Sequence, residues 1–222
     1  MTLSVLHTHT HTHTYLITDK YFVVLKQVAA IVGVKLYTIE RKSIKEVYTR
    51  LKGTAITANQ MKKIEDGKGE VRVFAGGKTA IFTKEEKIEN ANINDRPSVI
   101  VQSRGLIDVI YYAEKFTFKN EMWAYTHNDV IRVKYLYYIL KNNIQNFRDI
   151  ASSTGSFPQI SLGVTEDFKI LFPPLPVQQH VVDILDKFET LVNDVKEGLP
   201  HEIELRQKEY EYYREQLFNF KQ

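Results

Sequence analysis

Apolar residues recur at helical spacing along the last fifth of the chain. From Val181 to Phe220 steps of four and three residues alternate, apart from two consecutive four-residue steps around Leu199, and one position of the series is occupied by Arg206. This spacing is typical of a coiled-coil seam, and an apolar seam on a charged helix has to pack against another helix. We therefore predict a helical dimerisation and spacer region over residues 176–222. Its predicted interface consists of Val181, Leu185, Phe188, Val192, Val195, Leu199, Ile203, Tyr210, Tyr213 and Leu217.

The chain before this seam switches repeatedly between period-two alternation and helical spacing. Alternating or uniformly apolar short runs predict strands, and apolar positions three or four residues apart predict helices. The fold class expected from this mixture is α+β: a mixed α/β globular domain over residues 43–175, followed by a long C-terminal coiled-coil region. The predicted strands cover residues 35–39, 43–53 (ending in a turn), 71–74, 98–101, 109–112, 116–118 and 122–125, and the predicted helices cover 57–65 and 128–151.

Residues 1–42 form an N-terminal extension to which the sequence assigns no role. His-Thr is repeated four times between His7 and Thr14, and a helix-like apolar cluster follows at residues 22–32. A solvated tract explains the repeat better than a metal site made by four histidines on one face of a strand. Because His-Thr can be encoded by an uninterrupted CA repeat, we hypothesise phase-variable expression, which mixed codons in the gene would contradict.

Composition narrows the class of protein. Apolar residues make up 43% and charged residues 26% of the chain, as in a folded soluble protein, and the absence of cysteine excludes disulfides and thiolate chemistry. No early apolar run is long enough to cross a bilayer, so the expected location is the cytoplasm. Residues 1–175 carry 24 Lys or Arg against 17 Asp or Glu, a net charge of +7, whereas residues 176–222 carry six against ten, a net charge of −4. A basic globular part favours a polyanionic partner.

Two glycine-containing turns follow predicted strands. The first is Gly76-Gly77-Lys78, where the backbone and a lysine can approach a phosphate. It is not a P-loop, because that pattern requires glycine at the position of Arg72. The second is Ser103-Arg104-Gly105, in which the arginine is suited to bidentate contact with guanine or phosphate and the glycine permits close approach.

The sequence gives weaker evidence for metal binding, catalysis or base stacking. Glu85-Glu86-Lys87, with Asp66 upstream, contains half of a nuclease-type metal site, but a charged surface turn explains this run much better. His127 has no partner that would make it catalytic, and Trp123 is more typical of a core than of a base-stacking platform. We expect no catalytic residue and no metal site in this chain.

Taken together, these segments resemble the specificity subunit of type I restriction–modification systems. The resemblance is carried by the GSFPQIS run at residues 155–161, the PPLPVQQ run at 173–179, ILDKF at 184–188 and QKEYEYYR at 207–214. The turns at residues 75–78 and 103–105, with the run at 118–124, resemble a target recognition domain more loosely. This family has two recognition domains and two helical regions, whereas the present chain has one of each.

The resemblance implies a non-catalytic, sequence-specific DNA-binding subunit that directs methylation by a modification subunit to a bipartite site. Double-stranded DNA and the modification subunit are the implied partners, and a restriction subunit is a further one. S-adenosylmethionine would be brought by the modification subunit and not by this chain. We predict that this half-length chain restores two recognition domains by forming a homodimer through residues 176–222. A metal-dependent nuclease, and a truncated product that only dimerises, are the alternatives.

If the chain binds DNA, the chemistry of its side chains suggests roles for individual residues. Arg104, and after it Lys78, are expected to read base edges from their glycine-containing turns, together with Gly76, Gly77, Ser103 and Gly105. Contacts to the phosphate backbone are expected from Lys52, Lys62, Lys63 and Lys78.

Overall fold

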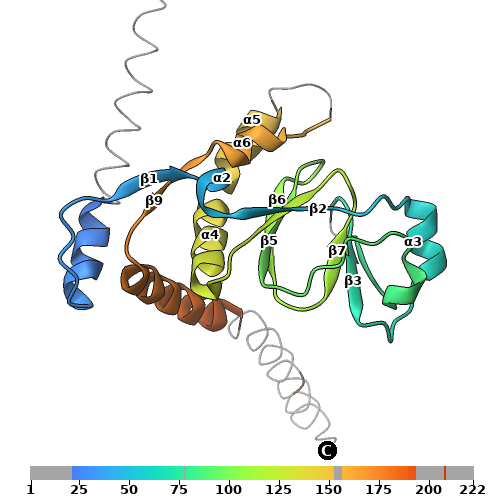
Figure 1. Cartoon of the computed structure of the whole chain (residues 1–222), viewed down its shortest axis with the longest axis horizontal. Helices are drawn as coiled ribbons and strands as arrows, with labels where there is room; N and C mark the ends of the chain where they lie inside the picture. The colour runs from blue at the N-terminus through green and yellow to red at the C-terminus, as the bar shows by residue number, and fades with distance from the viewer. Residues whose placement is uncertain (1–21, 78, 153–156, 194–207, 209–222) are drawn as a thin grey trace, which may run out of the picture. The chain divides into compact units, whose positions relative to one another are not determined.

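A computed structural model describes residues 22–77, 79–152, 157–193 and 208 of the chain (Figure 1). The chain divides into two compact units, Met1–Val182 and Asp183–Gln222. Among the described residues, no helix has the length and apolar character needed to cross a membrane. The three-part division into residues 1–42, 43–175 and 176–222 stays a prediction about function.

The first unit is built on two larger sheets and one two-stranded ribbon. The four-stranded antiparallel sheet has the order β2 (Thr49–Lys52), β8 (Trp123–Thr126), β5 (Ser98–Gln102), β6 (Asp108–Tyr112). The three-stranded sheet has the order β4 (Ala80–Thr83), β3 (Val71–Phe74), β7 (Phe116–Phe118), with β3 and β7 parallel. The ribbon pairs β1 (Glu40–Ser43) with β9 (Lys169–Phe172).

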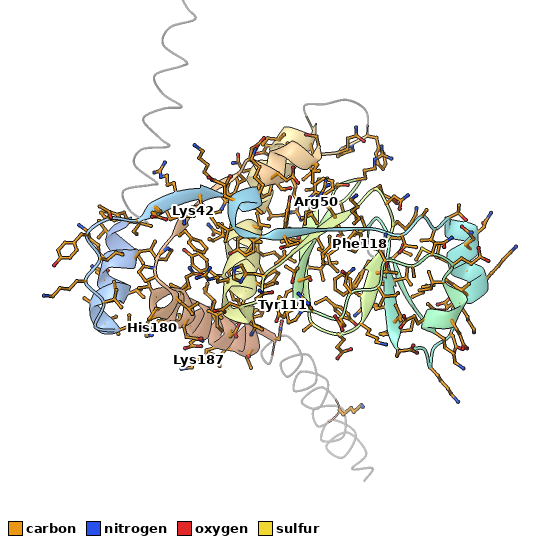
Figure 2. All side chains as sticks on the ribbon, in the orientation of Figure 1. Lys42, Arg50, Tyr111, Phe118, His180 and Lys187 are labelled. Atoms are coloured by element: carbon orange, nitrogen blue, oxygen red, sulfur yellow. The ribbon has the colours of Figure 1, made fainter. Side chains whose placement is uncertain are left out.

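The central strand β5 is buried on both faces, which explains its uninterrupted apolar sequence. Val99 and Val101 belong to the cluster that packs on α4 (Val130–Asn142) and α5 (Ile144–Ser152). Ile100, between them, belongs to a different cluster with Phe116 and Phe118 of the three-stranded sheet. Phe118 is labelled in Figure 2. Successive side chains of a strand point to opposite faces, so one strand joins two cores.

The helices begin where the sequence supplies a cap. The Asp129 carboxylate accepts hydrogen bonds from the backbone N–H groups of Ile131 (2.9 Å) and Arg132 (3.4 Å) and starts α4. A capping box between Thr57 and Gln60 starts α3 (Ala58–Ile64), close to the predicted helix over residues 57–65. The predicted helix over residues 128–151 is in fact two helices, because Asn143 ends α4 and donates its side-chain amide to the carbonyl of Ile139.

Two predicted strands differ from the structure, the first because strand pairing depends on a distant partner and the second because of a local helix cap. Residues 35–39 are not a strand: Leu36 and Ile39 pack into an apolar cluster, and β9 pairs with the next four residues instead. The predicted strand over residues 43–53 begins with a one-turn helix, α2 (Ile44–Val47), because Ser43 and Glu46 form a capping box. Strand β4 and helix α6 (Leu162–Glu166) were not predicted.

The N-terminal segment is part of the first unit. Residues 22–31 are helical and bury Leu25, Val28 and Ala29 against Val177, which lies in the helical residues 175–193. Segments on both sides of residues 43–175 therefore contribute to one small core. The His-Thr repeat lies outside the described residues.

Candidate nucleic-acid interface

Two turns that are 55 residues apart in the sequence pair with each other. The N–H of Gly105 donates to the carbonyl of Pro158 (2.9 Å), and the N–H of Ile160 donates to the carbonyl of Ser103 (3.0 Å). Between these bonds, Arg104 faces Gln159 in an isolated antiparallel bridge. Gly105 has φ +69°, a conformation that side chains other than glycine rarely adopt, so the turn requires glycine here. The Ser103–Gly105 turn and the PQIS motif thus form one short ribbon.

Buried polar side chains attach two further loops to this ribbon. The side-chain amide of Gln102 donates to the carbonyl of Gly77, and the hydroxyl of Ser103 donates to the carbonyl of Glu121. Gln102 and Ser103 are only 4% and 2% exposed, so these bonds are shielded from water. We call the assembly the loop junction; it comprises residues 76–77, 102–105, 120–121 and 158–160.

The Arg104 side chain is the exposed basic group of the loop junction. Its Nε–H donates to Oε1 of Gln159 at 3.0 Å. Exposure keeps the guanidinium accessible to a ligand, and the bond to Gln159 restricts where it points. An arginine held in this way is suited to recognise a ligand with two neighbouring acceptors.

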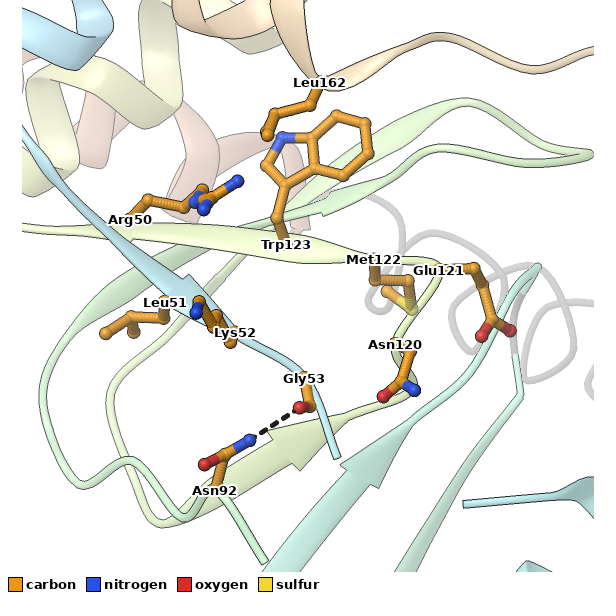
Figure 3. Close-up of a pocket in the computed structure, with 10 residues that line it drawn as sticks. All are labelled: Arg50, Leu51, Lys52, Gly53, Asn92, Asn120, Glu121, Met122, Trp123 and Leu162. Atoms are coloured by element: carbon orange, nitrogen blue, oxygen red, sulfur yellow. Dashed lines mark hydrogen bonds between the residues drawn. The ribbon is translucent and has the colours of Figure 1, made fainter. Parts of the chain in front are cut away.

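Two pockets flank the segment Asn120–Trp123 and share it as a wall. One, with a volume of about 540 Å³, lies on the side of β2 and is lined by Arg50 and Lys52 (Figure 3). The other, of about 610 Å³, is lined by Arg104 and Gln159. Basic and amide side chains therefore line both pockets. In Figure 3 the amide of Asn92 donates to the carbonyl of Gly53 (2.7 Å) at the edge of the first pocket.

Helix α6 supports the wall between the pockets. The hydroxyl of Thr165 lies 2.9 Å from Nε1 of Trp123, which donates to it, and 2.7 Å from the hydroxyl of Tyr125. Thr165 is fully buried, and an ion pair between Arg50 and Glu166 (3.7 Å) adds a second link to β2. Trp123 is thus a core residue with a satisfied N–H, in agreement with its interpretation from sequence.

The predicted DNA-binding residues fall into separate groups. Gly76, Gly77, Ser103, Arg104 and Gly105 belong to the loop junction. Lys52 lines the pocket beyond Asn120–Trp123, whereas Lys62 and Lys63 are exposed on α3, which packs on the three-stranded sheet through Met61. Lys78 lies outside the described residues. The individual DNA contacts stay predictions.

Sequence reasoning missed Arg50, Asn92, Asn120 and Gln159 as components of these pockets. Gln159 was visible as the central residue of the PQIS motif, but no local signal connects it to Arg104. The two asparagines come from loops, and only the tertiary structure brings them near β2.

The acidic residues that suggested a nuclease site are paired with lysines. Asp66 contacts Lys87 at 3.0 Å, and Glu85 contacts Lys115 at 3.1 Å. The hydrogen bond from Lys87 holds the pKa of Asp66 below its usual value. No group of three or more His, Cys, Asp or Glu side chains within the described ranges is placed to hold a metal ion.

The described part of the C-terminal helix carries an exposed apolar stripe. Its members are exposed by 39% to 61% and comprise Ile184, Phe188, Leu191 and Val192. Val181, predicted to lie in a dimer interface, packs against the cluster formed by Leu25, Val28, Ala29 and Val177. Leu185 is half-buried. The predicted interface residues from Val195 onward lie outside the described residues.

Comparison with known proteins identifies the class to which this fold and these motifs belong. The family model described as the type I restriction modification DNA specificity domain matches residues 37–205. The match covers more than half of the chain, and the chain therefore belongs to this family.

Individual relatives agree with this assignment. The chain is 45% identical over 105 residues to the type I restriction enzyme EcoR124I/EcoR124II specificity subunit of Escherichia coli, covering 47% of this chain and 26% of that protein. It is 31% identical over 185 residues to the type I restriction enzyme MpnII specificity subunit of Mycoplasma pneumoniae, covering 82% of this chain and 54% of the relative. The chain thus spans about half, or less, of the length of these relatives.

The fold is also that of a solved specificity subunit. The type I restriction–modification S subunit from M. genitalium superposes with a TM-score of 0.55 at 16% identity, covering 79% of this chain and 46% of that one. The likeness confirms a mixed α/β fold of this kind.

Proposed function

We propose that this chain recognises DNA for a type I restriction–modification complex and performs no catalysis itself. The observation that carries the proposal is the loop junction, where an exposed arginine is held beside glycines in a domain of the DNA specificity family. Base edges are read by side chains that are both accessible and oriented, and Arg104 meets both conditions. Lys78 is a second candidate for base contact.

The remaining basic residues contribute the part of the binding free energy that does not depend on the DNA sequence. Lys52, Lys62 and Lys63 are expected to contact phosphates and to make binding sensitive to salt. Lys52 is close to the loop junction through the shared pocket wall, whereas Lys62 and Lys63 lie on α3. This separation favours a DNA path that extends from the loop junction along the domain.

The C-terminal region would provide both dimerisation and docking. A coiled coil over residues 176–222 would join two copies and set the distance between two inverted half-sites. The same region would dock the modification subunit, which would bring S-adenosylmethionine and transfer the methyl group. A restriction subunit would join the same complex. The exposed apolar stripe supports this proposal, because apolar side chains in such a row are normally covered.

A paired substitution tests the DNA contacts. The full chain, purified with the modification subunit of its system, is mixed with a pool of random duplexes, and the bound fraction is sequenced. Arg104→Ala should lower preference for one base pair by about 1–3 kcal/mol, since it removes a bidentate contact. Lys63→Ala should weaken all duplexes alike and reduce the salt dependence by about one counterion.

The same experiment has two outcomes that would contradict the proposal. If Arg104→Ala keeps the sequence preference of the wild type, Arg104 does not read a base. If the wild-type complex enriches no sequence, the proposed function itself is wrong.

A further inference from the structure

Gln159 is the residue through which the PQIS motif touches the exposed arginine. Its backbone lies between two hydrogen bonds of the ribbon, so its side chain starts from a fixed position. Its Oε1 accepts the Nε–H of Arg104 at 3.0 Å. The partner of this contact is a neutral amide, so the full positive charge of the guanidinium is retained for a ligand.

The geometry of the guanidinium then determines which of the Arg104 N–H groups stay available to a ligand. Arginine has one N–H on Nε and four on its two terminal nitrogens, all in one plane. With Nε–H bound to Gln159, the plane is fixed and the end-on pair of terminal N–H groups stays available. Within the described ranges, the structure records no other hydrogen bond from the Arg104 side chain. Two parallel donors on a fixed plane match a ligand with two adjacent acceptors.

Provided that the chain reads DNA as proposed above, we infer that Gln159 is a positioning residue that directs Arg104 end-on at a guanine. Guanine presents two acceptors, O6 and N7, in the major groove, whereas adenine presents one acceptor and one donor. Two donors therefore favour a G·C pair. Without Gln159 the same arginine reaches many orientations, and part of the binding free energy is lost in ordering it.

Isosteric substitutions separate this role from a structural one. Gln159→Met keeps the length of the side chain and the backbone hydrogen bonds but removes the acceptor oxygen. Gln159→Glu restores an acceptor at the same place. Gln145→Met is the matched control, because Gln145 is also an exposed glutamine with a side-chain hydrogen bond, to Asp149 at 2.8 Å on α5.

The first measurement needs no DNA. In the full chain labelled with ¹⁵N-arginine, the Nε–H of Arg104, assigned by its loss in Arg104→Ala, should exchange slowly with water. Gln159→Met should accelerate that exchange, and Gln159→Glu and Gln145→Met should not. Equal exchange in the wild type and in Gln159→Met would overturn the positioning role at once.

The second measurement uses the random-duplex pool described above. The wild type should enrich a G·C pair at a position where Arg104→Ala loses about tenfold in preference. Gln159→Met should lose about threefold at the same position. Gln159→Glu should keep the preference for that base pair, while its negative charge offsets that of the guanidinium and weakens binding to every duplex. In the Arg104→Ala background, Gln159→Met should have no additional effect.

Each other outcome overturns a different statement. Enrichment by the wild type with unchanged preference in Gln159→Met refutes the role of Gln159 and leaves the proposed function intact. Equal weakening of every duplex by Arg104→Ala means that the arginine binds phosphate and not guanine. No enrichment by the wild type refutes the proposed function together with the readout role.

Discussion

The loop junction and the exposed apolar stripe are opposite kinds of surface. At the loop junction, polar groups from four segments are paired with one another, and the side chains of Gln102 and Ser103 are buried beneath an exposed arginine. On the stripe, Phe188 and Leu191 are 61% and 59% exposed in the described part of the second unit. The first surface is complete within one chain, whereas the second has its large apolar side chains in contact with solvent.

The difference teaches what each surface requires for its function. Pairing inside the protein removes most of the cost of ordering side chains when a ligand binds, which suits recognition of a precise pattern of acceptors. Apolar area gains free energy only when a partner removes it from water, at roughly 25 cal/mol per Å². Specificity is therefore expected to depend on the loop junction, and assembly on the stripe.

The largest effect is expected on the stripe. Phe188→Asp should weaken the proposed dimer by about 100-fold or more, because a charge would be buried at an apolar contact. Sedimentation equilibrium at micromolar concentration measures this directly. Thr190→Asp introduces the same charge on the same helix outside the stripe and should leave the dimer intact. A wild-type chain that is monomeric under these conditions would contradict the proposed dimerisation through the stripe.

The next largest effect is expected beneath the loop junction. Thr165→Val removes the hydroxyl shared by Trp123 and Tyr125 and leaves two buried polar groups unpaired, so it should lower the free energy of unfolding by about 2–3 kcal/mol. Urea denaturation followed by tryptophan fluorescence measures the loss. Thr165→Ser keeps the hydroxyl and should cost about 1 kcal/mol for the lost methyl group. Equal losses would show that the hydroxyl network contributes little.

The smallest effect concerns pH at the start of α4. Burial, and secondarily the nearby Arg132, lower the pKa of His127 below its usual value of 6.5, and its Nδ1 accepts the N–H of Asp129 at 2.9 Å. The unfolded chain therefore binds this proton before the folded one does. Stability contributed by neutral His127 is present above about pH 6.5 and declines as the pH falls below that value.

The measurement compares the urea midpoints at pH 7.5 and pH 5.5 for the wild type and His127→Gln. The wild type should lose more stability on acidification than the variant, by less than the effect of Thr165→Val. His180→Gln is the control, because it makes the same substitution at a second histidine, and it should keep the acid sensitivity of the wild type. Equal acid sensitivity in the wild type and His127→Gln would show that another group is responsible.

Local chemistry was enough to find most of the elements but not their connections. The apolar runs at residues 71–74, 98–101, 109–112 and 116–118 correctly predicted strands, because each needs only its own alternation or burial. The Ser43–Glu46 capping box was also local, yet it was read as a strand because its neighbours alternate. Strand β4 was missed because polarity does not follow its alternation: the apolar Phe82 is 40% exposed, whereas the polar Thr83 is buried.

The sequence by itself determined the family motifs, the mixed α/β fold class, the glycine that permits φ +69° at residue 105, and the basic character of residues 1–175. Only the tertiary structure decided that the Ser103–Gly105 turn pairs with Pro158–Ile160, and that Gln159 holds Arg104. The physical reason is that conformational preferences act over a few residues. A hydrogen bond between side chains 55 residues apart exists only after two cores have packed and brought their loops together.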